Sequence, residues 1–486
     1  MVLGPLLPRE RVELLADVLG KPTSTGRASR AVLADLIDPA DRSQVWLAAS
    51  VVSGELHDDQ TIIRLAREAE LDPDAFDRSV ASLLPPGPLG GLRVVSGPVL
   101  VDVSHTVSND YVTGIQRVVR ETVGRWLKTH DDVLPVAWTA GFTAMRRLTT
   151  HEAARLGIVD RTLSENADRA EIIVPWQTPI IVPELAAEAI RAKRMRAVGR
   201  FSGNPVGTIV HDLVPLVASE TTVVGMPDEF ARYLSALRHN RRIAAVSHSV
   251  ADEHEGWKAG LTAIGVTGPE IVGVPLPLHA GTVSQKSWRA AEERLRVGSL
   301  PMVLVVGSHE PRKNHLPILE AASRLWEEGL EFSLAFIGGG AWGGDDFTVR
   351  ARGLMDAGMP LDIVSGVSDG FIWAAYRLAR FTMFPSFYEG FGLPVAESLA
   401  SGTPCITSGF GSMKENAEGG GALLVDAYSD DDIRDKMRLL LTDDALLQRL
   451  RAEAAARSLR TWDDYATDLW EQLVMPLRAD RPERSA

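Results

Sequence analysis

The chain has 486 residues, of which 45% are hydrophobic, with a formal net charge of −13 and a single cysteine, Cys405. This length exceeds what one hydrophobic core supports, so we expect two large domains. A disulfide framework and a cysteine-based zinc cluster are excluded, and the acidic balance disfavours nucleic-acid binding. No run of 18 uncharged apolar residues is present and charges begin at Arg9, so we expect no transmembrane helix, no signal peptide and a reducing, cytoplasmic location.

The first 85 residues have the apolar spacing of helices and lack the alternation of strands. Prolines and glycines crowd residues 85–91, and we interpret 86–96 as a linker. Residues 1–85 are therefore a helical extension, in which we identify no chemistry. The predicted helices are 11–19, 31–37, 44–52, 61–68 and 73–84.

From residue 97, hydrophobic strands alternate with helices, which predicts parallel sheets covered on both faces. One alternating unit covers 97–275 and a second covers 276–460, and residues 461–486 carry a last helix with Trp462 and Trp470. Residues 104–113 read as a polar loop, and Gly114 opens the following helix. The predicted strands are 99–103, 133–138, 171–174, 206–210, 243–246, 270–274, 302–306, 332–337, 361–364, 381–384, 404–407 and 422–425.

Ligands of such sheets bind at the carboxyl ends of the strands. Several polar residues directly follow predicted strands, and this placement favours a site there. They are His105, His211, Ser247, Arg312, Lys313 and Glu389.

The most informative stretch follows the predicted strand 381–384. Gly390 and Gly392 allow close approach of the backbone to a ligand, and Pro394 suits the first turn of a helix. Glu389 and Glu397 flank that helix N-terminus, where free N–H groups and the dipole favour phosphate. Spacing alone leaves open a strand–loop–helix corner with solvated glutamates.

Residues 385–404 read PSFYEGFGLPVAESLASGTP, which resembles the glutamate–seven residues–glutamate signature of retaining glycosyltransferase family 4. Three other strings resemble segments of that family: GSHEPRKN at 307–314, HDLVPL at 211–216 and DVSHTVSNDYVTGIQR at 102–117. The resemblance covers about residues 97–475. It implies a GT-B fold, an α/β architecture with two facing Rossmann-like domains, 97–275 for the acceptor and 276–460 for the donor.

The resemblance also implies a function and a set of roles. A sugar would move with retention from a nucleotide-diphosphate donor to a glycan or lipid-linked glycan acceptor, in bacterial surface polysaccharide synthesis and without a metal. Arg312 and Lys313 would bind the diphosphate, Glu397 the ribose, and Glu389 would lie near the transferred sugar. His211 would orient sugar or phosphate. The remaining donor-binding residues would be Gly114, Gly338, Val367, Phe391, Gly392 and Leu393.

Other segments are less specific. Asp212 would fix the His211 tautomer or the loop, while His105, Asn109 and Asp110 would shape the acceptor pocket. Lys414 stands where the family usually has proline. Residues 430–432 are three aspartates that suggest a metal, but they open a helix, where acidic residues stabilise the dipole, and we reject the metal interpretation. The basic run 191–196 is interpreted as a solvated helix face, with peripheral contact to an anionic membrane as the alternative.

Three rival functions remain open on the sequence. A nucleotide-sugar epimerase shares the fold, as does a glycan phosphorylase, which is disfavoured because no pyridoxal-binding lysine site is recognisable. A catalytically silent nucleotide-sugar binder would act through the N-terminal helices. The sugar, the base, the acceptor, the oligomeric state and the role of residues 1–85 are not determined by the sequence.

Overall fold

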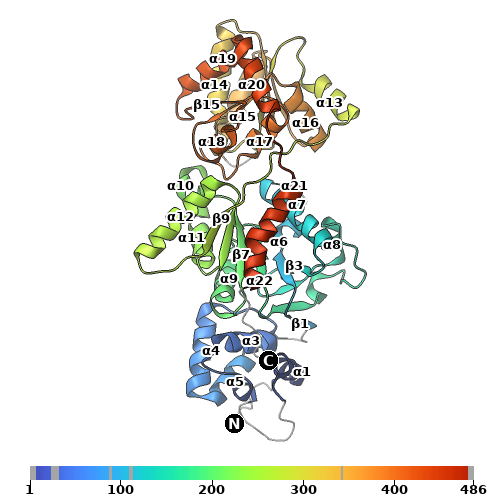
Figure 1. Ribbon diagram of the computed structural model, residues 1–486, viewed down its shortest axis with the longest axis vertical. Coiled ribbons are helices and arrows are strands. Elements are labelled where there is room, and N and C mark those ends of the chain that lie inside the picture. The colour runs from blue at the N-terminus through green and yellow to red at the C-terminus, as the bar shows by residue number, and fades with distance from the viewer. Residues whose placement is uncertain (1–6, 23–31, 87–89, 109–112, 341–342, 480–486) are drawn as a thin grey trace.

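The computed structural model describes residues 7–22, 32–86, 90–108, 113–340 and 343–479. Its three parts follow one another along the long axis, with helices at the N-terminal end, a nine-stranded sheet in the middle and a six-stranded sheet at the far end (Figure 1). The predicted α/β class is confirmed.

Five short helices form the N-terminal part, as predicted. Asp41, Asp58 and Asp72 each accept a hydrogen bond from a backbone N–H in the first turn of the helix that follows, which satisfies groups without intrahelical partners. The helices are α1 (Arg9–Val18), α2 (Val32–Leu36), α3 (Arg42–Ser53), α4 (Asp59–Leu71) and α5 (Pro73–Ala81).

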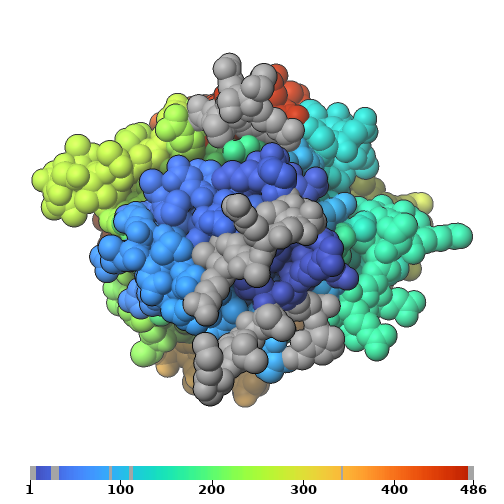
Figure 2. All heavy atoms as spheres, turned by 90° about the horizontal axis from the view of Figure 1, so that it is seen from below, coloured from blue at the N-terminus to red at the C-terminus, as the bar shows by residue number. Residues whose placement is uncertain are grey.

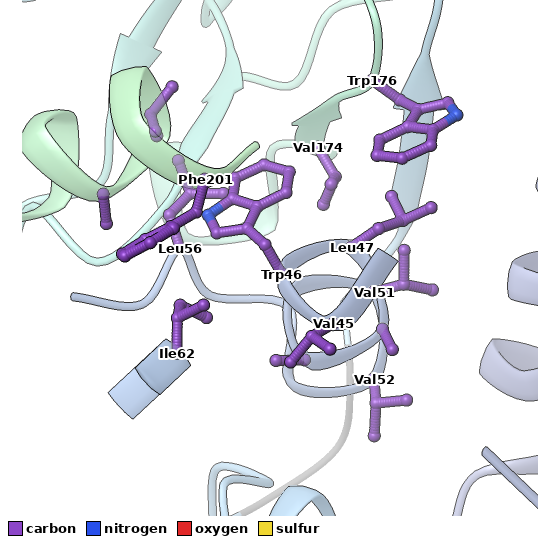
Figure 3. Packing of buried hydrophobic residues seen from close by; sticks show 14 of the residues in the cluster. Val45, Trp46, Leu47, Val51, Val52, Leu56, Ile62, Val174, Trp176 and Phe201 are labelled. Carbon is purple, nitrogen blue, oxygen red and sulfur yellow. The ribbon is translucent and has the colours of Figure 1, made fainter. Parts of the chain in front are cut away.

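These helices share a hydrophobic core with the sheet domain behind them. Helix α3 is buried from Val45 to its end, and its Trp46 packs beside Leu56 and beside Phe201 of helix α9 (Ala189–Phe201), while Leu47 points toward Val174 of the sheet (Figure 3). Seen from below, the N-terminal helices cover the centre of the end face, and the sheet domain projects beyond them on both sides (Figure 2). The helical extension is therefore docked on the sheet domain and does not hang free of it.

The basic run 191–196 lies on α9 and faces this junction. Arg191 is fully buried, Arg194 donates to the carbonyl oxygen of Leu56, and Arg196 pairs with Asp59 at 3.0 Å. The predicted solvated face is wrong because these guanidinium groups bind the N-terminal helices and buried acids, while Lys193 alone of the run's basic residues is exposed.

The middle sheet has the order β1-β5-β4-β3-β2-β6-β7-β8-β9, and its strands run parallel except β4, which is antiparallel to both neighbours. The strands are β1 (Leu92–Val95), β2 (Val99–Asp102), β3 (Val133–Trp138), β4 (Met145–Arg147), β5 (Ile172–Pro175), β6 (Ile180–Val182), β7 (Val206–Val210), β8 (Arg242–Ala245) and β9 (Glu270–Gly273). The helices besides α9 are α6 (Ser104–Ser108), α7 (Gly114–Thr129), α8 (Thr150–Arg155), α10 (Val214–Val217), α11 (Met226–Leu237) and α12 (His248–Ala263).

Two boundary predictions are wrong in this domain. Strand β1 lies inside the predicted linker 86–96 and pairs with β5, because its residues complete the edge of the sheet. Helix α6 begins in the predicted polar loop 104–113, where buried acid groups hold its first turn, as described below.

The second sheet is wholly parallel, in the order β12-β11-β10-β13-β14-β15. The strands are β10 (Met302–Val306), β11 (Ser333–Ile337), β12 (Leu361–Val364), β13 (Phe381–Phe384), β14 (Cys405–Ser408) and β15 (Ala422–Val425). The helices are α13 (Gln285–Leu295), α14 (His315–Glu327), α15 (Asp345–Asp356), α16 (Asp369–Leu378), α17 (Leu393–Ala400), α18 (Gly411–Ala417), α19 (Asp430–Thr442) and α20 (Asp444–Ala455).

The chain then returns to the middle domain through its last helices. Helix α21 (Trp462–Leu469), a π-helical stretch at Trp470–Val474 and helix α22 (Met475–Ala479) share the core of the first sheet. Trp126 of α7 donates its indole N–H to the carbonyl oxygen of Ala466 at 2.9 Å and meets the ring of Trp470 edge-on. The two sheet domains are therefore joined twice, once near residue 276 and once by this helix.

Candidate active site

The two sheet domains meet at the carboxyl ends of their strands. Ser247, which follows β8, donates from Oγ to the carbonyl oxygen of Gly390, which follows β13, at 2.7 Å. Glu415 of α18 accepts hydrogen bonds from the backbone N–H groups of His248 and Ser249 at 3.0 and 2.9 Å. A carboxylate of one domain thus caps the N-terminus of α12 in the other, which its dipole favours.

A buried charge cluster lies in the loops that follow β10 and β13 of the second sheet. Oε1 of Glu389 lies 2.6 Å from both Arg312 Nη1 and Lys313 Nζ, and Ser386 Oγ donates to the same oxygen at 2.8 Å. Burial alone would raise the pKa of Glu389, but the two cations outweigh it and lower the pKa to about 2. Glu389 is therefore ionised, and the interpretation as a solvated loop carboxylate is wrong.

The cluster sets two cations against two carboxylates. Arg312 and Lys313 share Glu389, and Glu310 also pairs with Arg312, at 3.0 Å. Burial lowers the pKa of Lys313, although Glu389 acts in the opposite direction. Burial would also lower the pKa of Arg312, but Glu389 and Glu310 outweigh it and raise that pKa. The arrangement holds two cations in place before any anionic ligand arrives.

Glu397 lies in α17 and is bound from both domains. Arg117 of α7 donates to its Oε1 at 2.5 Å, and the hydroxyl of Tyr376 donates to its Oε2 at 3.0 Å. The Arg117 guanidinium also lies 5.7 Å from the centre of the Trp373 ring. Burial raises the pKa of Glu397 although Arg117 opposes the shift. The residue predicted to bind ribose is thus held by a cation that crosses the domain junction.

Two glycines of the site are required by close packing. A Cβ on Gly390 would lie 1.7 Å from the carbonyl oxygen of His211, and one on Gly338 would lie 1.8 Å from that of Gly307. Gly392 precedes α17 with a φ of 81°, in the left-handed region that favours glycine. The close approach of Gly390 brings the loop of Glu389 against His211 of the other domain.

The other predicted donor-binding residues surround the same junction. A Cβ on Gly114 would lie 3.3 Å from Cδ1 of Leu393, so the glycine that opens α7 faces the start of α17. Phe391 is buried beside them, and its carbonyl oxygen accepts from the Asn416 side chain. Val367 packs against the cluster that contains Trp373, on the Glu397 side. The predicted backbone contacts of Phe391, Gly392 and Leu393 to a ligand stay predictions.

His211 is uncharged and presents one acceptor nitrogen. Burial lowers its pKa to about 4, and its Nε2 lies 3.0 Å from the carbonyl oxygen of Pro183. A carbonyl oxygen only accepts, so Nε2 carries the proton and Nδ1 is the acceptor. Asp212 accepts from the backbone N–H of Val214 at 3.1 Å, which favours the loop-positioning alternative for Asp212.

The segment after β2 is anchored by buried acids. Arg191 Nη2 lies 2.7 Å from Asp102 Oδ2 and 3.4 Å from Glu184 Oε1, and Glu184 accepts from the backbone N–H of His105 at 2.6 Å. The His105 ring pairs with Glu188, a hydrogen bond that raises its pKa. This network starts α6 and fixes His105, whose predicted role toward an acceptor stays a prediction.

Several sequence predictions fall outside the site or outside the described residues. Asn109 and Asp110 lie outside the described residues. The aspartates 430–432 form the first turn of α19, which Ser429 caps. Within the described ranges no group of three or more His, Cys, Asp and Glu side chains could hold a metal ion. Lys414, at the position of the family's proline, lies within α18.

Sequence reasoning missed the partners of four residues, three of them at the junction of the sheet domains. Arg117 ends the motif 102–117 and lies one helical turn after Gly114, a spacing that places it on the same face of the helix. Tyr376 carried no polar signal, because it ends the apolar run 371–376 of its helix. Glu415 and Arg191 belong to ordinary charged helices, and only their partners in space distinguish them.

Known proteins resemble this chain in sequence and in fold. Residues 287–457 match the family model described as glycosyl transferases group 1. The C-terminal sheet domain is a glycosyl transferases group 1 domain. The serotype-specific mannosyltransferase WbdA of Escherichia coli is 30% identical over 331 residues, which cover 66% of this chain and 38% of that protein. The chain thus spans well under half the length of the curated relatives it matches first.

The chain also resembles solved structures in its fold. Sucrose-phosphate synthase of Thermosynechococcus elongatus has a TM-score of 0.55 at 15% identity, covering 77% of this chain and 98% of that one. The Anabaena protein HepE, solved with UDP and glucose, has a TM-score of 0.54 at 12% identity, covering 77% and 98%. These likenesses show that the fold is GT-B, as predicted. In the described ranges, none of the helices is both long and apolar enough to cross a membrane.

Proposed function

We propose that the protein is a retaining glycosyltransferase that moves a hexose from a nucleotide-diphosphate donor to a glycan or lipid-linked glycan. The observation that carries the proposal is the buried Arg312–Lys313–Glu389 cluster, placed in a glycosyl transferases group 1 domain directly across the junction from His211. Two fixed cations suit a leaving diphosphate whose charge grows in the transition state.

The similarity to WbdA favours mannose as the transferred sugar and a bacterial surface polysaccharide as the product. The reaction would take place in the cytoplasm. The alternative of membrane contact through residues 191–196 loses support, because Arg191, Arg194 and Arg196 bind groups within the chain.

In the proposed reaction, the bond from the anomeric carbon to the diphosphate oxygen breaks while the acceptor hydroxyl attacks from the same face. The acceptor proton passes to the departing phosphate oxygen, and retention of configuration follows. Arg312 and Lys313 would stabilise the negative charge, so no metal ion is needed for this step, and chelator would leave the rate unchanged. The N-terminus of α17 adds N–H groups on the same side.

His211 would position the sugar. With Nε2 bound to Pro183, its neutral ring offers Nδ1 to a sugar hydroxyl. Glu397 would accept the two ribose hydroxyls, and the ribose would then compete with Arg117 for the same carboxylate. Donor binding would thus exchange an interdomain ion pair for contacts to the nucleotide, and domain closure would exclude water as a competing acceptor.

The test is a thermal-shift screen with UDP-, GDP-, dTDP- and ADP-linked hexoses, mannose included. A ligand at 100 times its Kd stabilises the native state by about 2.7 kcal/mol. We expect one donor to raise Tm, and Lys313→Ala and Glu397→Ala to abolish the rise, while Lys286→Ala, an exposed lysine of α13, leaves it intact. If no nucleotide sugar binds, or if the site variants respond like Lys286→Ala, the proposal fails.

A further inference from the structure

Three aromatic rings form a small platform at one edge of the second sheet. Phe387, Phe410 and Tyr428 follow β13, β14 and β15, the three neighbouring strands at that edge. The ring of Tyr428 stacks on Phe387 with centroids 4.9 Å apart and lies nearly parallel to Phe410 at 6.3 Å. Tyr428 is 75% exposed, and it is the one aromatic residue among the exposed large hydrophobic side chains of the described residues.

Hydrogen bonds connect the platform to the segments that carry the charge cluster. The backbone N–H of Phe387 donates to the carbonyl oxygen of Arg312 at 2.9 Å, and Asn314 donates from its side chain to the carbonyl oxygen of Ala427 at 2.8 Å. Ser412, two residues after Phe410, donates to the carbonyl oxygen of Glu389 at 2.7 Å. Each of the three rings is thus placed by a hydrogen bond to or from the segments that carry Arg312 and Glu389.

We propose that this platform is a binding subsite for a neutral hexose unit of the acceptor glycan, which stacks on the ring of Tyr428. The inference rests on the proposed transferase function and names where its acceptor is held. The face of an aromatic ring is electron-rich and attracts C–H groups, which one side of a pyranose presents while its hydroxyls face outward.

The sheet order separates this subsite from the nucleotide. Gly338 and Val367, predicted on the donor side, follow β11 and β12 at the opposite edge of the sheet. Phe387 lies two residues before Glu389 in the loop that follows β13, so the platform adjoins the predicted place of the transferred sugar.

The surrounding charge favours a neutral ligand. Asp426 and Asp430 flank Tyr428 in the chain and are exposed, so their carboxylates disfavour a phosphate or an anionic headgroup and can accept from sugar hydroxyls. A protein partner is disfavoured because a stable interface covers about 800 Å² on each side, far more than one exposed ring offers.

The experiment measures the Kd of linear trisaccharides of mannose, glucose, galactose and N-acetylglucosamine by saturation-transfer NMR on the full chain. We expect at least one to bind, Tyr428→Ala to weaken it about tenfold, and Tyr428→Phe to bind like wild type, because the ring face is kept. Val224→Ala, at a fully exposed side chain outside the platform, serves as the control. Because Tyr428 is exposed, the Tm of Tyr428→Ala should match wild type.

Absence of binding by any trisaccharide to the wild type, or equal Kd values for wild type and Tyr428→Ala, would overturn the subsite. The nucleotide-sugar thermal shift, measured on the same samples, separates the two proposals. If Tyr428→Ala binds trisaccharide weakly but keeps the thermal shift with the nucleotide sugar, only the subsite has been lost. If the wild type binds a trisaccharide but no nucleotide sugar raises its Tm, the subsite stands and the proposed transferase function fails.

Discussion

Replacing Glu389 by Gln removes the carboxylate that two buried cations share. The side chains of Glu389, Arg312 and Lys313 are 11%, 14% and 10% exposed, so solvent replaces little of the lost interaction. Lowering a carboxyl pKa from 4.5 to about 2 corresponds to about 3 kcal/mol of stability, and leaving a buried charge without its partner costs about 3–5 kcal/mol. We therefore expect Glu389→Gln to lower the free energy of unfolding by about 3 kcal/mol.

The assay is urea denaturation at pH 7 and at pH 4, with Glu310→Gln as the matched control. Glu310 forms an ion pair with Arg312 at 3.0 Å, accepts from the Ser308 hydroxyl and is 22% exposed, so its replacement should cost less than about 1 kcal/mol.

The pH dependence of the difference has a definite sign. The folded pKa of Glu389 lies below its ordinary value, so its contribution is complete above pH 4.5 and is lost as pH falls toward 2. The difference in the free energy of unfolding between wild type and Glu389→Gln should therefore be smaller at pH 4 than at pH 7. A Glu389→Gln chain as stable as Glu310→Gln at pH 7 would refute the counterion role.

Three further changes test other contacts. Gly390→Ala would put a Cβ 1.7 Å from the carbonyl oxygen of His211, so the sheet domains should move apart in small-angle scattering and Tm should fall by about 5 °C. Arg191→Met leaves Glu184 buried without its cation and should cost about 3 kcal/mol in urea. Burial lowers the pKa of His315 to about 3, so below pH 6.5 the unfolded chain binds a proton that the folded chain does not. As the pH decreases below 6.5, the free energy of unfolding of the wild type should therefore fall by about 1.4 kcal/mol per pH unit more than that of His315→Phe.

Each of these expectations has a contradicting outcome. Unchanged scattering and Tm for Gly390→Ala would show that the junction is looser than the close approach indicates. An Arg191→Met chain as stable as wild type would mean that the buried acids need no counterion. Identical pH slopes for wild type and His315→Phe would mean that the imidazole is charged in the folded chain.

The periodic elements could be predicted from the sequence, and the shortest elements could not. Strands such as β7 and β10 are continuous apolar runs between loops, and they lie within a residue of the predicted bounds. Strands β4 and β6 have three residues each, too few for a pattern. Strand β1 was hidden because it directly follows a proline- and glycine-rich stretch and completes the sheet only through β5.

The parts of the site formed by residues adjacent in the sequence could be predicted. The parts formed where two distant segments meet could not. The spacing of Glu389 and Glu397 pointed to the loop and helix that hold them. The partner of Glu397 is 280 residues away, and no local pattern links Arg117 to it. Arg191 illustrates the same limit, because a run of basic residues on a helix has the same spacing whether it meets water or buried acids.

The measurement that tests the transfer reaction most directly is real-time proton NMR of the stabilising nucleotide sugar mixed with the protein, with and without the trisaccharide that binds best. The proposed mechanism predicts release of the nucleoside diphosphate, abolished in Lys313→Ala, and a first-formed product with the anomeric configuration of the donor. A first-formed product of the opposite anomeric configuration would contradict retention. No release of nucleotide from any donor would contradict the transferase itself.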